Sequence, residues 1–334
     1  MIRVALDAMG GDHAPAAPVT GAAEALAEIA DDVVIQLVGQ RAAIEREISD
    51  QHRGHERIEI VDAPEVIGMG EKPLQAVRTK RRSSIHVGLE LQREGLSHAF
   101  ISAGNTGAVM AASILILRLH PGFERPAIGT PFPTADHAVL LVDGGANVDC
   151  SPQELVGFAH LGVLYARDAM GRADPAVALL NIGEEEEKGN AATKEAHRLL
   201  RDSGLKFVGN VEGGDILAGR SAAGPFDVVV CDGFVGNVLL KFYESVPRLF
   251  TRLVRRELGE AVAESDAMDR ITRILDYAEY GGAPLLGVHG VSIVCHGRST
   301  PGAFRNAIRV AERAARNHLE QDMTREFDTA GAGS

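Results

Sequence analysis

The sequence predicts an α/β fold in which a mostly parallel sheet is covered by helices on both faces. Short apolar runs alternate with helical stretches along the 334 residues, which is the pattern of repeated strand–helix units. Glycine-rich turns follow several of these apolar runs. In an open parallel sheet such turns lie at the carboxyl ends of the strands, where ligands bind. We expect one α/β domain over residues 1–334 with two lobes, and a protruding helical pair at 238–280.

Local patterns predict the individual elements. Short apolar runs indicate strands, whereas apolar residues at helical spacing, in places begun by a Pro, indicate helices. The predicted strands begin at Ile2 and span 33–38, 58–62, 99–101, 138–142, 177–180, 206–208, 228–230 and 291–295. The predicted helices span 18–29, 41–48, 73–91, 108–119, 188–203, 238–257 with a kink at Pro247, 265–280 and 303–319, and another ends near Ala169. Residues 63–73 are predicted as loop, 121–134 as loop and irregular strand, and the tail beyond 319 as frayed.

The composition excludes several classes of protein. A hydrophobic content of 45% and a mean hydropathy near zero are typical of a soluble globular chain. Aromatic residues make up 4%, Trp is absent and the net charge is −12, so we expect no nucleic-acid partner. The chain enters a strand at Ile2 without a signal-peptide pattern, which favours the cytoplasm. Cys150, Cys231 and Cys295 lack the spacing of a zinc site or a disulfide framework.

Glycine turns that open helices are the main candidate for a binding site. The segment Ser102–Ala108 follows an apolar run, and turns of the same kind span 6–13, 142–147, 181–190, 231–237 and 295–300. A strand–turn–helix unit directs backbone N–H groups and the positive end of the helix dipole at an anion. An equally simple interpretation is that the glycines serve the turn geometry and the polar residues cap helices. The candidate substrate-binding residues are Asp7, Gly10, Gly11, Asp12, Gly104, Thr106, Gly107, Asp143, Asn147, Asn190, Asp232, Asn237 and His296.

Three further side chains are candidates for catalysis: His13, Asn105 and Lys188. His13 follows the first strand closely and should lie at the rim of a cleft, although Asp12 capping a helix beside an exposed His13 is an open alternative. Asn105 has two interpretations as well: it binds a ligand, or it only caps a helix. Lys188 follows an acidic run at the start of a predicted helix, where its charge opposes the dipole. A bound anion would account for that placement.

Several known site types are missing from the sequence. There is no G-x-x-x-x-G-K-[ST] motif, and the glycines at 10–11 do not fit G-x-G-x-x-G, which weakens any nucleotide assignment. A G-x-S-x-G elbow is absent as well. No set of carboxylates or histidines has a recognisable metal-ligand spacing. We therefore expect no metal and no cofactor in an anion-accepting α/β protein.

The motifs resemble those of one known family, the bacterial phosphate acyltransferases (PlsX). The resemblance rests on residues 7–15, 71–73, 102–108, 143–150, 181–190, 231–241 and 280–287, and runs from Ile2 to about Ala311. It implies transfer of a fatty acyl group from acyl carrier protein to inorganic phosphate, which gives acyl phosphate for phospholipid synthesis. It also implies a homodimer, a fold akin to phosphotransacetylase and isopropylmalate dehydrogenase, and a membrane glycerol-phosphate acyltransferase that uses the product.

The resemblance suggests a mechanism in which phosphate attacks the thioester carbonyl directly. Glycine-loop N–H groups, Lys188 and Asn105 would bind the phosphate, and His13 would handle a proton on phosphate or on the leaving thiol. A rival route has the thiolate of Cys231 or Cys295 take the acyl group first. Two other functions stay open from the residues alone. They are an NAD(P)-linked dehydrogenase of a related fold and a non-enzymatic protein that binds acyl groups or phosphate metabolites.

An acidic carrier protein needs a basic docking patch on a chain that is itself acidic. One candidate patch is Arg78–Arg82, and the other lies on the helix after residue 238. We expect docking at Arg252, Arg255 and Arg256, next to Lys241 and Arg248. The apolar stripe of the helical pair at 238–280 favours a homodimer, and peripheral membrane contact is its alternative.

Overall fold

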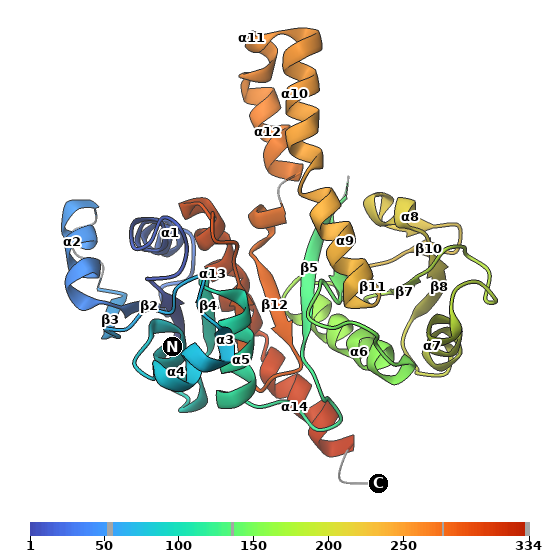
Figure 1. The fold of residues 1–334 in the computed structure, drawn as a ribbon, viewed down its shortest axis with the longest axis horizontal. Helices are drawn as coiled ribbons and strands as arrows, with labels where there is room; N and C mark the ends of the chain where they lie inside the picture. Colours follow the sequence, from blue (N-terminus) through green and yellow to red (C-terminus); the bar gives the residue numbers. More distant parts are fainter. Residues whose placement is uncertain (52–55, 135–136, 276, 331–334) are drawn as a thin grey trace. The chain divides into compact units, whose positions relative to one another are not determined.

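A computed structural model describes residues 1–51, 56–134, 137–275 and 277–330. The chain divides into two compact units, which are described separately (Figure 1). The first unit contains Met1–Pro126, Arg167–Gly171 and Gly281–Ser334. The second contains Ala127–Ala166 and Arg172–Tyr280.

The sheet of the first unit is parallel except for one strand. Its order is β3-β2-β1-β4-β13-β12, and only β12 runs antiparallel, against β13. The strands are β1 (Ile2–Asp7), β2 (Val33–Gly39), β3 (Ile58–Asp62), β4 (Ala99–Ser102), β12 (Ala283–Leu286) and β13 (Val291–Val294). Val4, Ala5 and Leu6 of β1 are fully buried, so this strand is covered on both faces.

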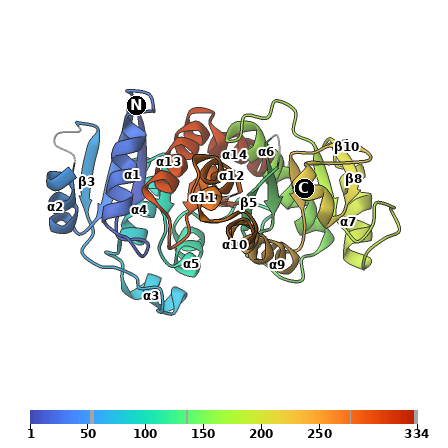
Figure 2. The same cartoon turned by 90° about the horizontal axis from the view of Figure 1, so that it is seen from above.

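Helices cover the first sheet on both sides. Its helices are α1 (Ala16–Leu26), α2 (Arg41–Gln51), α3 (Pro73–Thr79), α4 (Ser84–Arg93), α5 (Thr106–Ile116), α13 (Pro301–Arg316) and α14 (Leu319–Ala330). Figure 2 shows α1 beside α13 on one face, and α4 and α5 on the other. The α1–α13 contact requires Gly21, because a Cβ there would lie 2.6 Å from the Cβ of Phe304.

Within the second unit the strands follow the order β5-β6-β11-β7-β8, in which only β5 is antiparallel, to β6. The strands are β5 (Ala127–Pro133), β6 (Ala138–Val142), β7 (Val177–Leu180), β8 (Phe207–Val211) and β11 (Val228–Val230), with a small pair β9 (Arg220–Ser221) and β10 (Gly224–Pro225). The helices are α6 (Pro152–Asp168), α7 (Ala191–Arg201), α8 (Gly213–Ala218), α9 (Gly233–Tyr243), α10 (Val246–Leu258), α11 (Glu260–Ala263), α12 (Asp266–Leu275) and the 3-10 helix η1 (Tyr277–Tyr280). Figure 1 shows α10 and α12 side by side, extending beyond the sheet of this unit.

The predicted alternation of strands and helices is confirmed, and the differences lie in how helices are divided. The predicted helix 73–91 is two helices, because Ser83 takes an extended conformation and caps α4 by accepting the N–H of His86. The predicted helix 238–257 is also interrupted: α9 ends at Tyr243, and α10 begins at Val246 with Pro247 in its first turn. Pro is favoured there, because the N–H that it lacks has no partner within the helix.

The chain end and two strands differ more from the prediction. The tail beyond 319 is the helix α14, which buries Leu319 and Met323 and pairs Asp322 with Arg167. The strands β5 and β12 were not predicted as regular strands, because the prolines that both contain read as loop signals.

Candidate functional site

The turn after β1 is organised by the buried carboxylate of Asp7, whose side chain is 1% exposed. One oxygen accepts the N–H of Met9 at 3.0 Å, and the other accepts the hydroxyl of Ser102 at 2.7 Å. Ser102 in turn accepts the N–H of Gly104 at 3.0 Å. Burial raises the pKa of Asp7, and the hydrogen bonds from Ser102, Ser84 and the turn oppose that rise. This carboxylate joins the turns after β1 and β4 and has no accessible face for a substrate.

The glycines of these turns are required by close contact between backbones. A Cβ on Gly10 would lie 2.7 Å from the N of Gly104, and one on Gly11 would lie 3.1 Å from the O of Gly297. Gly11 also has a φ of 100°, which favours glycine. Asp12 N donates to Gly297 O at 2.7 Å. The turns after β1, β4 and β13 therefore interlock at the carboxyl edge of the first sheet.

The segment around the start of α5 has the strand–turn–helix form that the sequence predicted. Asn105 caps the helix by accepting the N–H of Ala108 at 3.1 Å. The helix geometry leaves the N–H groups of Thr106 and Gly107 without an intrahelical partner, and Thr106 is exposed. Gly107 has a packing role too, since a Cβ there would lie 2.7 Å from Cγ of Pro73 in α3.

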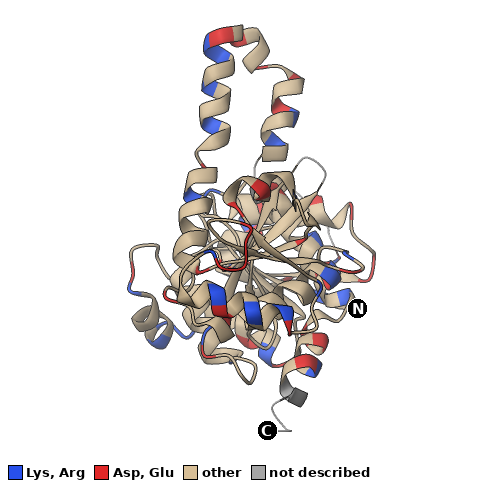
Figure 3. Ribbon diagram, turned by 90° about the vertical axis from the view of Figure 1, so that its right-hand side faces the viewer, with Lys and Arg blue, Asp and Glu red and all other residues tan. Residues whose placement is uncertain are grey.

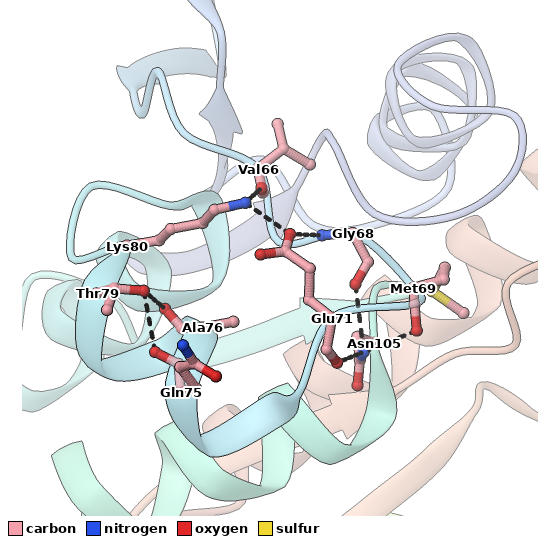
Figure 4. A network of polar contacts seen from close by, with 9 residues as sticks. All are labelled: Val66, Gly68, Met69, Glu71, Gln75, Ala76, Thr79, Lys80 and Asn105. Atoms are coloured by element: carbon pink, nitrogen blue, oxygen red, sulfur yellow. Dashed lines mark hydrogen bonds and ion pairs between the residues drawn. The ribbon is translucent and has the colours of Figure 1, made fainter.

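Asn105 also holds the loop between β3 and α3, a contact that was not predicted from the sequence (Figure 4). Its amide nitrogen donates to the carbonyl oxygens of Gly68, Met69 and Glu71, at 3.3, 3.0 and 3.3 Å. The whole amide group is thus engaged inside the protein, so in this geometry Asn105 holds the loop rather than binding a ligand. The carboxylate of Glu71 accepts the Gly68 N–H at 2.6 Å and pairs with Lys80 at 2.6 Å. The hydrogen bonds from Lys80 and Gly68 lower the pKa of Glu71.

Two histidines flank the turns of the first unit. His13 is exposed, and it precedes α1, which begins at Ala16. Asp12 is not the helix cap, because Pro15 occupies that position and makes no side-chain capping bond. His296 is half-buried after β13, and its Nδ1 accepts the N–H of Arg298 at 3.1 Å. The neutral His296 ring therefore carries its proton on Nε2.

In the second unit, the turn after β6 is also organised by a buried carboxylate, that of Asp143. Asp143 is 0% exposed. Its Oδ1 accepts the N–H groups of Ile128, Gly145 and Ala146 at 2.9, 3.1 and 3.1 Å. Its Oδ2 accepts the N–H and the side-chain amide of Asn147 at 2.7 and 2.9 Å. Burial raises the pKa of Asp143, and the backbone donors oppose the rise. Like Asp7, Asp143 holds a turn and does not offer an oxygen to a substrate.

The turn after β11 packs on the turn after β6. Asp232 caps α9 by accepting the N–H of Phe234 at 2.8 Å, and its other oxygen accepts the N–H of Cys150 at 2.8 Å. Asn237 was expected at the start of a helix, but it is an exposed residue within α9. A Cβ on Gly145 would lie 2.9 Å from the Cβ of Asn237, so this pair brings the two turns together.

Lys188 lies outside the helix in which it was predicted. The helix α7 begins at Ala191, because Asn190 caps it by accepting the N–H of Thr193 at 2.9 Å. Gly189 has a φ of 93°, which keeps this segment out of the helical conformation. The argument that Lys188 opposes the helix dipole is therefore wrong. The side chain is exposed, and its Nζ lies 4.0 Å from a carboxylate oxygen of Glu185.

All three cysteine thiols are buried and held in the neutral form. Burial raises the pKa of Cys150 and Cys295 to about 12, and it raises the pKa of Cys231 well above the usual value. The nearby carboxylates Asp143 and Asp232 raise the pKa of Cys231 further. A nucleophilic cysteine needs an accessible, stabilised thiolate, so the covalent route has no support in this geometry.

The predicted docking residues Arg252, Arg255 and Arg256 are exposed on α10. Figure 3 shows Lys and Arg positions recurring along the protruding helices. Arg255 pairs with Glu260 and Arg256 with Glu257, whereas among the described residues Arg252 has no carboxylate within 4.0 Å. Arg248, Arg252 and Arg255 line a cavity of about 360 Å³ between α10 and α12. Exposed apolar side chains accompany them along α9, α10 and α12: Val238, Phe242, Leu249, Phe250, Leu253, Ile271 and Ile274.

Other possible sites in the described part of the chain are few. A cavity of about 350 Å³ lies in the first unit at the amino ends of β4 and β13, lined by His98, His289 and His318 among others. It contains none of the predicted site residues. Among the described residues, no group of three or more His, Cys, Asp or Glu side chains is placed to hold a metal ion. Within the same ranges, no helix is long and apolar enough to span a bilayer.

Residues 2–322 match the protein family described as "Fatty acid synthesis protein". The chain belongs to this family. It is 49% identical over 326 residues to the "Phosphate acyltransferase" of Heliobacterium modesticaldum, covering 95% of both chains. It is 47% identical over 325 residues to the protein of the same name from Desulforamulus reducens, covering 96% of this chain and 95% of the relative. The resemblance that the motifs indicated is confirmed, and with it the class of enzyme, an acyltransferase.

Solved structures show the same fold. The EutD phosphotransacetylase from Staphylococcus aureus matches with a TM-score of 0.64 at 16% identity, covering 95% of this chain and 94% of that one. A phosphotransacetylase from Streptococcus pyogenes also matches with a TM-score of 0.64, at 17% identity and with the same coverage. The predicted fold class, with its likeness to phosphotransacetylase, is therefore confirmed.

Some supporting residues of the site were not predicted from the sequence. Ser102 was quoted only as the first residue of a motif, although its position before the glycine turn is a signal that its hydroxyl faces that turn. Glu71 and Lys80 stand nine residues apart and carry opposite charges. Nothing in that spacing reveals a contact, because an intervening helix brings the two residues together.

Proposed function

We propose that the chain transfers a fatty acyl group from acyl carrier protein to inorganic phosphate, forming acyl phosphate for phospholipid synthesis. The name of these relatives, phosphate acyltransferase, supports phosphate as the acceptor, and the family description supports a donor from fatty acid synthesis. The observation that carries the proposal is the start of α5. There, unpaired N–H groups of Thr106 and Gly107 follow a turn that is fixed by buried hydrogen bonds.

Direct attack needs no covalent enzyme intermediate. A phosphate oxygen attacks the carbonyl carbon of the thioester, a C–O bond forms, and the C–S bond then breaks to release the carrier thiolate. At neutral pH the phosphate is already an anion, so its attacking oxygen does not have to be deprotonated first. The contribution of the protein is to orient the two substrates and to direct N–H donors at the developing oxyanion.

The proton that the departing thiolate takes up is assigned in this proposal to His13. An imidazole donates protons effectively near neutral pH, and His13 is exposed beside the turn after β1. Lys188 of the second unit is proposed as an anion-binding side chain. Its exposed pair with Glu185, at 4.0 Å, is worth little, so an anion can replace the carboxylate.

We further propose that acyl carrier protein docks on α10 through Arg252, Arg255 and Arg256. Docking on an acidic chain requires a local basic surface, and these arginines are exposed. The apolar side chains along α9, α10 and α12 support a second copy of the chain as their partner, giving a homodimer. In this proposal the protein works in the cytoplasm, with at most peripheral membrane contact. Its product goes to a membrane glycerol-phosphate acyltransferase.

The test is release of free thiol from acyl carrier protein loaded with a palmitoyl group, measured with and without inorganic phosphate. Phosphate-dependent release with formation of acyl phosphate is the expected result. Release that is independent of phosphate, or binding without release, would contradict the proposal and favour a simple binding protein. His13→Asn should lower kcat by about 100-fold or more if the imidazole handles the proton. The matched control His318→Asn, at an exposed position with a φ of 62° that Asn tolerates, should leave kcat unchanged.

A further inference from the structure

The loop between β3 and α3 ends in an exposed tip, Gly68–Met69–Gly70. Met69 is 57% exposed, and a single exposed apolar side chain needs no explanation by itself. What needs an explanation is how firmly this tip is held. A segment with glycine on both sides of one residue loses much conformational freedom when it is fixed, so a fixed tip of this kind is costly.

Two side chains from other elements hold the tip (Figure 4). Asn105, at the start of α5, donates to three carbonyl oxygens of the loop, from Gly68, Met69 and Glu71. Lys80, after α3, donates to the carbonyl oxygen of Val66 at 2.8 Å and pairs with Glu71. Glu71 closes the network by accepting the Gly68 N–H at 2.6 Å.

The network places Met69 against the turns that carry the candidate site. A Cβ built on Gly297 would lie 3.5 Å from Cε of Met69 and 3.6 Å from a carboxylate oxygen of Asp12. The Asp12 N–H donates to the carbonyl oxygen of the same Gly297. The methyl group of Met69 therefore stands over the junction of the turns after β1 and β13. It is an exposed apolar group beside the exposed, charged side chain of Asp12.

We propose that Met69 is a substrate-contacting residue that packs against the acyl chain, and that Asn105 is a positioning residue that holds Met69 in place. The inference rests on the proposed function, because it assigns the fatty acyl group to this side of the turns. A thioether suits the role, since Met is unbranched and adapts to chains of different conformation. Asn105 acts in two directions through one amide: its oxygen caps α5 and its nitrogen fixes the loop.

The experiment compares kcat/KM for acyl carrier protein loaded with a palmitoyl group and with a butyryl group, in the full-length protein. Met69→Ala should lower kcat/KM for the palmitoyl donor by about tenfold and for the butyryl donor by less than about twofold, because only the longer chain makes the full contact. Met69→Leu, which conserves volume, should restore the palmitoyl value. Leu74→Ala removes a comparably exposed apolar side chain from α3 and is the matched control, expected to change neither donor.

Asn105→Ser tests the positioning role. Serine caps a helix as well as asparagine does but cannot donate to the three carbonyl groups, so α5 should stay intact while the loop is released. The expected result is faster proteolytic cleavage within 66–72 together with the chain-length profile of Met69→Ala, and an unchanged phosphate KM. Faster cleavage within 66–72 together with wild-type kcat/KM values for both donors would overturn the positioning role of Asn105.

The same measurements separate failure of this inference from failure of the proposed function. A wild-type protein without phosphate-dependent thiol release overturns both. An active wild-type protein whose Met69→Ala variant treats both donors alike overturns only the contact between Met69 and the acyl chain.

Discussion

Replacing Asp143 by Asn tests whether the buried carboxylates hold turns or bind a ligand. The substitution keeps the shape and one oxygen, which can go on accepting the N–H groups of Ile128, Gly145 and Ala146. The other oxygen becomes an NH₂ group. It faces the backbone N–H and the side-chain amide of Asn147, which in the wild type donate to Asp143 at 2.7 and 2.9 Å. Rotation of the Asn147 side-chain amide can turn its oxygen toward the new NH₂ group and restore the side-chain contact. The contact with the Asn147 backbone N–H is lost, because two donors then face each other.

The magnitude follows from these contacts. A lost hydrogen bond between a buried N–H and a charged acceptor costs about 1.5–3 kcal/mol. The three retained bonds become weaker because their acceptor is now neutral, and relief from burying a charge offsets part of that loss. We expect a net destabilisation of about 3 kcal/mol, which lowers the melting temperature by about 6–12 °C in a protein unit of this size.

Thermal and urea unfolding of Asp143→Asn measure this effect directly. Asp149→Asn is the matched control, because Asp149 is exposed and its φ of 55° is one that Asn also adopts. The control should lie within about 0.5 kcal/mol of the wild type. An Asp143→Asn protein with wild-type stability and no activity would refute the reasoning. It would show that the carboxylate acts on a ligand and not on the turn.

Two further predictions concern the reaction and its donor. Cys231→Ala and Cys295→Ala should each retain phosphate-dependent thiol release within about twofold, because a thiol with a pKa of about 12, as for Cys295, is ionised in only about one molecule in 100,000 at pH 7. A loss of activity with the fold intact would restore the covalent route. Arg252→Glu should raise the KM for acyl carrier protein by about tenfold at low salt, less at high salt, and leave the phosphate KM unchanged. Arg78→Glu, in the other basic patch, serves as its control. If only Arg78→Glu raises the KM for acyl carrier protein, the docking site lies at Arg78–Arg82 and not on α10.

The sequence was sufficient for the strands and for most helices because both depend on local patterns. Val4, Ala5 and Leu6 form a short apolar run, and such a run bounded by turn residues becomes a buried strand. The break between α3 and α4 falls in residues 78–84, which hold no apolar side chain, so the apolar pattern is interrupted there. This stretch was nevertheless predicted as one helix, because its apolar positions on either side were assigned to a single buried stripe. The side chain of Ser83 determines where α4 begins, because its capping hydrogen bond competes with a continuous helix.

Locating the turns of the candidate site was also possible from sequence, but assigning their residues was not. Asp7 and Asn190 look alike in the sequence, each a polar residue at a glycine turn. The structure makes one a buried carboxylate that joins two turns and the other an exposed cap of α7. The distinction depends on neighbours that are far away in the chain, such as Ser102 for Asp7. Only the fold brings those neighbours together.

The buried carboxylates have a consequence for where an anion can bind. In the first unit Asp7 takes the N–H groups of Met9 and Gly10, and Ser102 takes that of Gly104. A phosphate therefore cannot use these three N–H groups, because they already donate to Asp7 and Ser102. The N–H groups of Thr106 and Gly107 at the start of α5 are not engaged in this way, and the Asp7 network determines their position without touching the anion. Substitutions at Asp7 or Ser102 should accordingly change phosphate KM through displacement of that helix start.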